Sequence, residues 1–512
     1  MNSATLIRTL IIYAICVPLA VFLGYELTSP LARSTYYVLG LLVLALTFPV
    51  LLRWHHFLLF ATWNLAAVLF FIHGQPPIWM LMVAISLGVS ILQRTTDKTK
   101  RFSFEPHLVL PLIGLAVVIL ATAHYTGGIG IRALGSEVYG GKRYVILLAS
   151  VLGYFALTAQ RIPPERAGLF VAAFFLPGIT KAIGDLFLIV PPSLQGIFWV
   201  FPPNVGSIRG NVFELGTTRL GGISGAATMA FFFLMAQYGV RSGILSARLW
   251  RPALILALLP ICLLGGFRSV VFTLILVFVI QFFLEGLHRT KWLPVMILSG
   301  LFLAVVTAVI TPRLPFTFQR ALAFLPLKVD PAARLDAQYS TEWRIQMWKA
   351  VLPEVPEHFW LGKGYALNPL AYDLMQTRSE NLRFAENWDA TIAGNYHNGP
   401  LSVILTFGIW GVMAFFWFLF AVNRALYLNF RYGPSEFRMY NTFLLALCIT
   451  KTVYFFLIYG SIEKDLFDFV GLVGLSISLN GGVCRRAQVA LSEKEELETR
   501  PMIPVRMRPF PG

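Results

Sequence analysis

One imidazole and three guanidinium groups are the side chains of this sequence best suited to chemistry on a phosphorylated substrate. They occur in an Arg-Leu-Gly-Gly run at Arg219, in Gly-Phe-Arg-Ser around Arg268, in Glu-Trp-Arg at Arg344 and in Tyr-His-Asn at His397. Arg forms bidentate, charge-assisted hydrogen bonds to phosphate oxygens, so three of them could neutralise a diphosphate without a divalent ion. A His at the same level could take the proton from an attacking sugar hydroxyl.

Each of these residues also has a plain structural explanation. An Arg at the end of a membrane span is often a topology anchor or a contact to a lipid head group. Arg344 could pair with a neighbouring acid such as Glu342, and His397 could cap the following helix. Within the spans, Lys451 has no obvious local partner, and an internal polar cavity leading to the site or snorkelling to an interface explains it equally well. Asn398 is a second possible cavity residue.

The elements that must position these residues are membrane helices. The 512 residues are 57% hydrophobic and 13% charged, with a mean hydropathy of +0.70, which lies outside the range of a soluble globular domain. A hydrocarbon core about 30 Å thick needs about 20 apolar residues per helix. The sequence therefore predicts an all-α integral membrane protein of about fourteen spans. They begin near Leu6, Tyr36, Phe57, Ile78, Leu108, Tyr144, Gly168, Gly222, Pro252, Val270, Leu293, Leu401, Met439 and Phe467.

The Lys and Arg residues predict the orientation of these spans. With the N-terminus inside, the inner loops and the tail after the last span carry seventeen Lys or Arg, and the short outer loops carry eight. Loops with an excess of Lys and Arg usually lie on the cytoplasmic side, so both termini are expected there. The large polar segment 311–397 is then expected on the outer side of the membrane. It holds nine basic and nine acidic residues, so the net charge of +16 is mostly a topology signal and needs no nucleic acid.

The chain divides by composition into four parts. An N-terminal bundle covers 1–310, the large loop covers 311–397, further spans cover 398–484, and a charged tail covers 485–512. In the loop, Ser340 or Thr341 is expected to cap a helix that Pro353 and Pro356 stop, as one of two or three short helices. Within the span from Gly168, Lys181 and Asp185 are one turn apart, which favours an internal ion pair.

The order of these motifs resembles the O-antigen ligase/Wzy polymerase superfamily. The matching runs are Arg-Leu-Gly-Gly before a span, Gly-Phe-Arg-Ser between two spans, Glu-Trp-Arg-x-x-x-Trp in the loop, and His-Asn-x-x-Leu ahead of a Gly-x-x-Gly span. The resemblance covers roughly residues 219–411. It implies an inverting, metal-independent glycosyltransferase of the GT-C type that uses no cofactor. His397 matches the catalytic His, and Arg219, Arg268 and Arg344 match the diphosphate-handling arginines. Gly-Phe-Arg stands where Ser-x-Ser-Arg is more usual.

The resemblance also implies the substrates. The donor would be a glycan on undecaprenyl diphosphate, and the acceptor a glycan or lipid-linked sugar hydroxyl. A ligase for lipopolysaccharide and a repeat-unit polymerase for surface polysaccharide or exopolysaccharide both fit. A transporter or flippase of lipid-linked or anionic solutes is the alternative from another class, because it would use the same Arg without catalysis. The lack of a convincing internal repeat weighs against it. No His-x-x-x-His or Cys-x-x-Cys spacing predicts a metal site.

Overall fold

The computed structural model describes residues 33–72, 74–97, 103–127, 141–204, 219–365 and 394–486, with a few residues between 13 and 25. Three predicted features lie mostly or entirely outside them: the span from near Leu6, a short element at Asn368-Pro369, and the tail beyond 486. The described residues form α- and 3₁₀-helices joined by turns, with an isolated β-bridge between Val68 and Pro77. The predicted all-α class is confirmed.

Seven helical segments of the described chain are long and apolar enough to cross a membrane. Two further apolar helices, α10 (Trp250–Leu263) and α11 (Arg268–Leu284), are shorter. The total number of spans stays a prediction. The seven segments are Ile78–Thr96, Pro106–Thr126, Pro164–Phe187, Gly221–Gly243, Trp292–Arg313, Gly399–Tyr432 and Ser435–Leu457.

Contacts divide the chain into two units, Met1–His55 and His56–Gly512. Helix α2 (Arg33–Trp63) lies mostly in the first. The separate span predicted from near Phe57 is not present, because this helix ends at Trp63. Beyond it, the backbone N–H of Ala66 donates to Oγ1 of Thr180 at 3.1 Å, and that of Val68 donates to the carbonyl of Val200 at 2.8 Å. The backbone is thus satisfied by neighbouring elements rather than by a continuing helix.

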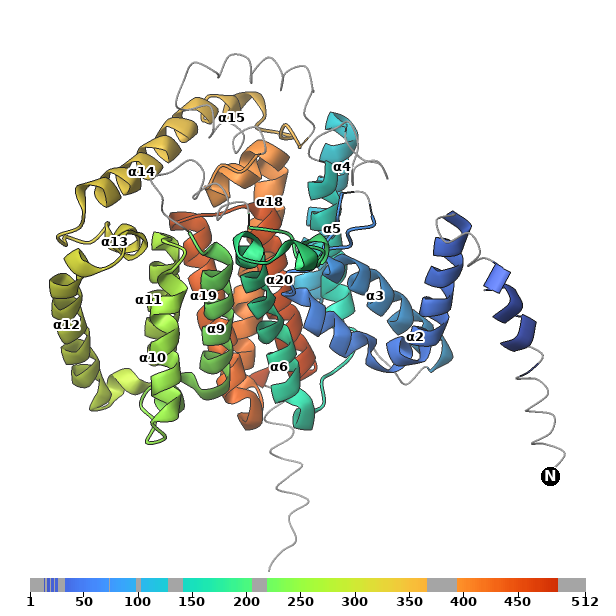
Figure 1. The fold of residues 1–512 in the computed structure, drawn as a ribbon, viewed down its shortest axis with the longest axis horizontal. Helices are drawn as coiled ribbons and strands as arrows, with labels where there is room; N and C mark the ends of the chain where they lie inside the picture. Colours follow the sequence, from blue (N-terminus) through green and yellow to red (C-terminus); the bar gives the residue numbers. More distant parts are fainter. Residues whose placement is uncertain are drawn as a thin grey trace, which may run out of the picture. The chain divides into compact units, whose positions relative to one another are not determined.

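The core of the second unit is built on three C-terminal helices, which lie in its centre in Figure 1. Nearly all of α20 is buried, and it packs against α5, α18 and α19. Helix α18 also packs against α4, and α19 also contacts α9 and α11. The helices named here are α4 (Pro106–Thr126), α5 (Gly141–Leu157), α9 (Gly221–Gly243), α18 (Gly399–Tyr432), α19 (Arg438–Leu457) and α20 (Ile462–Asn480).

Three helices of the large loop pack on this unit: one of them, α13, contacts α10 and α11, and another, α15, contacts α18 (Figure 1). They are α13 (Phe316–Leu322), α14 (Pro331–Val351) and α15 (Glu354–Glu357). The number of helices in the whole loop stays a prediction, because 366–393 lie outside the described residues. The predicted start at Ser340 or Thr341 is wrong. Asp330 caps α14 instead, accepting the backbone N–H of Ala332 at 2.8 Å, and Pro331 fills the first helical position.

Helix α18 breaks at Gly408, and a loop segment docks into the break. Gly408 has a φ of +64°, so the helical hydrogen bonds on either side of it are interrupted. The backbone N–H of Lys363 donates to the carbonyl of Leu405 at 2.8 Å, and that of Gly364 donates to Thr406 at 3.0 Å. The loop thereby satisfies carbonyls that the break sets free. This docking fixes the large loop to the core directly below α15.

Replacing Gly408 by Ala should therefore destabilise the protein and impair its function. An L-residue at a φ of +64° and a ψ of −163°, a region that is essentially restricted to Gly, costs on the order of 1–3 kcal/mol, and the added Cβ would collide with the carbonyl of Trp360. Thermal unfolding in detergent should show a lower midpoint for Gly408→Ala. Gly300→Ala, in helix α12 (Trp292–Ile310), is the matched control, because no heavy atom lies within 4 Å of its Cβ position. Equal midpoints for the two variants would contradict the docking.

One predicted ion pair is wrong. Lys181 and Asp185 lie in a 3₁₀-helix, η3 (Leu176–Leu188), rather than in an α-helix. At about three residues per turn, positions i and i+4 point roughly 120° apart. Asp185 instead accepts the backbone N–H of Ile223 at 2.7 Å, at the start of α9, and the side-chain amide of Asn204 at 3.0 Å. Its carboxylate therefore stabilises the positive end of α9.

Candidate active site

Helix α14 gathers the three predicted arginines. Arg219 precedes α9, and its Nη2 lies 3.7 Å from Oδ1 of Asp336 on α14. Arg268 opens α11, and its Nη2 donates to Oγ1 of Thr341 on α14 at 3.1 Å. Arg344 belongs to α14 itself. From Asp336 to Arg344 the helix rises about 12 Å, so the three guanidinium groups follow one short stretch of α14.

The arginines differ in how their charges are balanced. Asp336 forms ion pairs with both Arg219 and Arg320. In the described part of the chain, Arg268 and Arg344 form no ion pair. The Nε atom of Arg344 is buried without a hydrogen-bond partner among these residues, and burial lowers the pKa of its guanidinium. A desolvated cation without a counter-ion is unfavourable, so this position is suited to an anionic ligand.

Thr341 holds Arg268 next to Arg344. Its hydroxyl donates to the carbonyl of Ala337 at 3.1 Å, one turn back on α14, and accepts the hydrogen bond from Arg268. Residues three apart on a helix have Cβ atoms about 5–6 Å apart. The guanidinium bound to Thr341 is therefore about one helical turn from Arg344. Two cations that form no ion pair in the described structure, at this spacing, are suited to the adjacent phosphates of a diphosphate.

The segment carrying His397 is fixed by α14 on one side and by α18 on the other. Nε1 of Trp348 donates to the carbonyl of Tyr396 at 2.8 Å, and Tyr396 is 1% exposed. The side chain of Asn398 accepts the backbone N–H of Leu401 at 3.1 Å and so caps α18. A contact of Asn398 with substrate stays a prediction. His397 between them has a φ of +50°, an uncommon conformation for a residue other than Gly.

The His397 ring is enclosed by aromatic side chains. The ring centroids of Trp343 and Tyr459 lie 5.2 and 4.7 Å from that of His397, both in edge-on geometry. Nδ1 of His397 is buried and has no hydrogen-bond partner among the described residues. Burial, with a smaller contribution from the positive charge of Arg344, lowers the pKa of His397 to about 4. The imidazole is therefore neutral at pH 7 and able to accept a proton.

Sequence reasoning did not assign Tyr459 to the site. It follows α19, and its hydroxyl lies 3.3 Å from Oδ1 of Asn395. Tyr454, on the last turn of α19, lies 6.1 Å from Tyr459 between ring centroids, and both interact electrostatically with Arg344. Aromatic residues are frequent throughout this chain, so no local signal distinguishes these two. They form the side of the site opposite α14.

Lys451 is not at this site in the described structure. Its Nζ lies 2.6 Å from Oδ2 of Asp468 on α20, within the helical core. The sequence shows no local partner for Lys451 because its partner comes from the next helix rather than from a neighbouring turn. A small cavity of about 30 Å³ lies beside the pair, and most of its lining residues are apolar. A role for Lys451 in substrate binding stays a prediction.

The segment of the chain that matches a known family contains the residues of this site. Residues 219–416 match the model of the O-antigen ligase family. The match begins at Arg219 and contains Arg268, Arg344 and His397. No curated protein matches the chain. Among the described residues, no cluster of three or more His, Cys, Asp or Glu side chains is arranged to hold a metal ion. The match indicates glycan transfer of the ligase or polymerase type, and residues 219–416 of this membrane protein belong to the O-antigen ligase/Wzy polymerase superfamily.

Proposed function

We propose that the protein transfers a glycan from undecaprenyl diphosphate to an acceptor sugar hydroxyl, as an O-antigen ligase or a repeat-unit polymerase. The observation that carries the proposal is the placement of Arg344 near His397, whose Nδ1 has no hydrogen-bond partner in the described structure, with Arg268 held by Thr341 one helical turn from Arg344. The arginines supply the charge to bind a diphosphate, and the imidazole supplies the base to activate a hydroxyl.

The proposed reaction is a single displacement at the anomeric carbon. The acceptor oxygen forms a bond to C1 of the donor sugar while the bond from C1 to the diphosphate oxygen breaks. The acceptor proton passes to His397, and the electron pair leaves with the diphosphate. Arg268 and Arg344 stabilise the charge that develops on this leaving group. Attack opposite the leaving group inverts the configuration at C1. Because the arginines carry the electrostatic stabilisation, the proposed mechanism requires no divalent ion.

The proposed setting is a bacterial inner membrane crossed by about fourteen spans. The bias of Lys and Arg toward alternate loops supports cytoplasmic termini. In this orientation α13, α14 and α15 belong to a periplasmic loop covering 311–397, between the bundles 1–310 and 398–484. The site then lies at the outer membrane boundary, where the diphosphate head group of a lipid-linked glycan is available.

Reconstitution of the full chain in liposomes tests the proposal. Supplied with a glycan on undecaprenyl diphosphate and an acceptor, the protein should release undecaprenyl diphosphate and form a new glycosidic product, with EDTA present. A longer lipid-linked glycan would identify a polymerase, and a glycan on a second acceptor would identify a ligase. Movement of the intact donor across the bilayer without any new product would instead identify a flippase. A strict requirement for Mg²⁺ would contradict the metal-free mechanism.

A further inference from the structure

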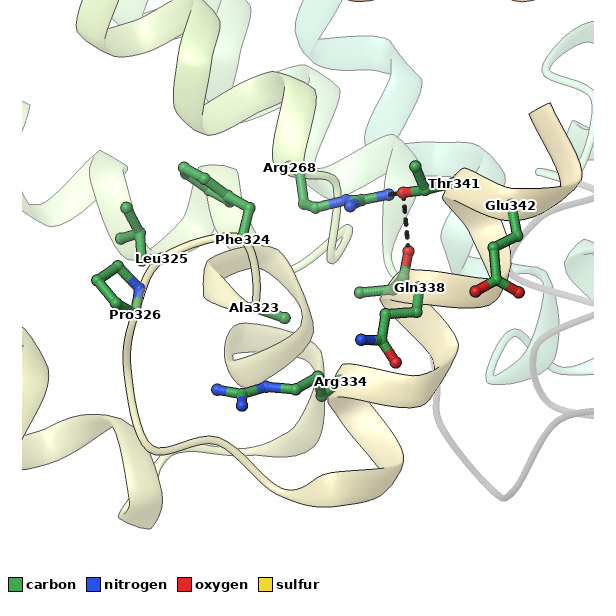
Figure 2. Close-up of a pocket in the computed structure, with 10 residues that line it drawn as sticks. Arg268, Ala323, Phe324, Leu325, Pro326, Arg334, Gln338, Thr341 and Glu342 are labelled. Carbon is green, nitrogen blue, oxygen red and sulfur yellow. Dashed lines mark hydrogen bonds between the residues drawn. The ribbon is translucent and has the colours of Figure 1, made fainter. Parts of the chain in front are cut away.

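A pocket of about 520 Å³ is lined in part by Arg268, which Figure 2 shows beside Thr341. It is formed between α13 and α14, over the start of α11. Small-molecule sites in proteins occupy roughly 300–1,000 Å³, so this pocket is large enough for a saccharide. It is lined by Arg268, Ala323, Phe324, Leu325, Pro326, Arg334, Ala337, Gln338, Thr341 and Glu342.

One wall of the pocket is a polar stripe of α14. Arg334, Gln338 and Glu342 are spaced four residues apart, so their side chains project from one face of the helix. Arg334 donates to the carbonyl of Leu327 at 2.7 Å, which holds the loop that closes the pocket. Gln338 and Glu342 are exposed to the pocket and form no hydrogen bond or ion pair within the described chain. An amide and a carboxylate are suited to adjacent hydroxyl groups, since together they donate and accept.

The opposite wall is apolar. It consists of the run from Ala323 to Pro326, and Figure 2 shows these side chains across the pocket from Gln338 and Glu342. Phe324 packs on Phe272 of α11, with ring centroids 4.6 Å apart. A ligand for this pocket therefore needs hydroxyl groups on one side and C–H groups on the other, as a pyranose has. An acyl chain would match the apolar wall alone, because it has no hydroxyl group for Gln338 or Glu342.

The position of Arg268 indicates which sugar the pocket receives. Arg268 lines the pocket and is also joined through Thr341 to the stretch of α14 that carries Arg344. A ligand that extends from a diphosphate at these arginines enters the pocket with the group bonded directly to the phosphate. In a lipid-linked glycan this group is the first sugar. The acceptor hydroxyl must instead approach from the side of His397.

We infer that this pocket between α13 and α14 binds the diphosphate-linked sugar of the donor glycan, with Gln338 and Glu342 as its hydroxyl ligands. The inference rests on the proposed function. It makes the two residues determinants of donor specificity rather than catalytic residues. Their removal should weaken recognition of the glycan and leave recognition of the diphosphate unchanged.

Kinetics of the reconstituted full chain test this inference. Gln338→Ala and Glu342→Gln should each raise the donor KM roughly 3- to 10-fold, the range for one lost hydrogen bond. The acceptor KM should not change. Glycan-free undecaprenyl diphosphate, used as an inhibitor, should keep its inhibition constant in both variants. Gln346→Ala is the matched control, because Gln346 is exposed on α14 but does not line the pocket.

The outcomes separate this inference from the proposed function. If the wild type transfers glycan and both variants keep the wild-type donor KM, the pocket does not bind the donor sugar. A raised acceptor KM would assign the pocket to the acceptor and overturn the inference. A wild type that transfers no glycan would overturn the proposed function itself. Gln338→Asn provides a second variant with the same chemistry and a shorter reach, and thermal unfolding of each variant identifies any loss caused by misfolding.

Discussion

His397→Ala should abolish glycan transfer while the protein still binds its donor. Removing a general base lowers turnover by roughly 10²–10⁴-fold. Arg268 is held by Thr341, and no hydrogen bond of the described structure joins either Arg268 or Arg344 to the imidazole, so the affinity for undecaprenyl diphosphate should be retained. The measurement is the rate of product formation at saturating donor, together with direct binding of glycan-free undecaprenyl diphosphate.

His397→Asn tests the base more specifically, because it removes the imidazole while the new residue can still adopt the backbone conformation of His397. His397 has a φ of +50°, and Asn is among the residues that adopt this region most readily. An amide cannot take a proton at neutral pH, so this variant should also be inactive. His358→Ala is the control, since His358 lies in the same loop and ends α15. Near-normal turnover of His397→Asn would exclude the imidazole as the base.

The sequence allowed prediction of the site because each element carries its own signal. Arg219, Arg268 and His397 lie within two residues of the start of an apolar helix, so hydropathy alone places them near a membrane boundary. Their convergence on α14 is a property of the tertiary structure. It depends on Asp336, Thr341 and the two tryptophans of that helix, whose spacing is visible in the sequence but whose partners are not.

The errors arise where distant residues determine the local structure. Lys451 has no acid one turn away in the sequence, and its partner Asp468 comes from the adjacent helix. The start of α14 was placed at Ser340 or Thr341 because a Ser-Thr-Glu run resembles a cap. In the structure Thr341 bonds back to Ala337 within the helix and receives Arg268. The Thr341 hydroxyl, which could have capped a helix, therefore binds a side chain from another helix instead.

The break in α18 shows a further limit of sequence reasoning. The Gly-x-x-Gly run at Gly408 and Gly411 contributes to the family resemblance, but it does not predict a break in the helix. Its physical role appears once the loop is placed, because the carbonyls of Leu405 and Thr406 bond to the N–H groups of Lys363 and Gly364. A glycine in an apolar span does not by itself show whether a helix bends, packs closely or receives another segment.

Arg344→Gln should produce two separable changes. First, the donor KM should rise roughly 10- to 100-fold, because a charge-assisted hydrogen bond to phosphate is worth about 1.5–3 kcal/mol. Second, the pKa of His397 should rise, since Arg344 is a like charge that disfavours the imidazolium. Burial is the larger cause of the low pKa and remains in the variant, so the new pKa should lie between about 4 and 6.5.

The pH dependence of kcat/KM measures this second change. The active form of a general base is neutral His397, so activity is lost as the pH falls through its pKa in the free enzyme. The wild type should lose activity near pH 4, and Arg344→Gln at a higher pH. Arg344→Lys keeps the positive charge but loses the bidentate fork. It should raise the donor KM while leaving the acidic limb close to that of the wild type.

Lys349→Gln is the control for both changes, because it removes an exposed positive charge from α14 five residues beyond Arg344. It should match the wild type in donor KM and in pH profile. If Arg344→Gln shifts the donor KM but not the acidic limb, the guanidinium binds donor without influencing the base. If it shifts the limb but not the donor KM, Arg344 acts on His397 alone, and Arg268 and Arg219 must bind the diphosphate. Only both shifts together support one site in which the same charge holds the donor and keeps the imidazole neutral.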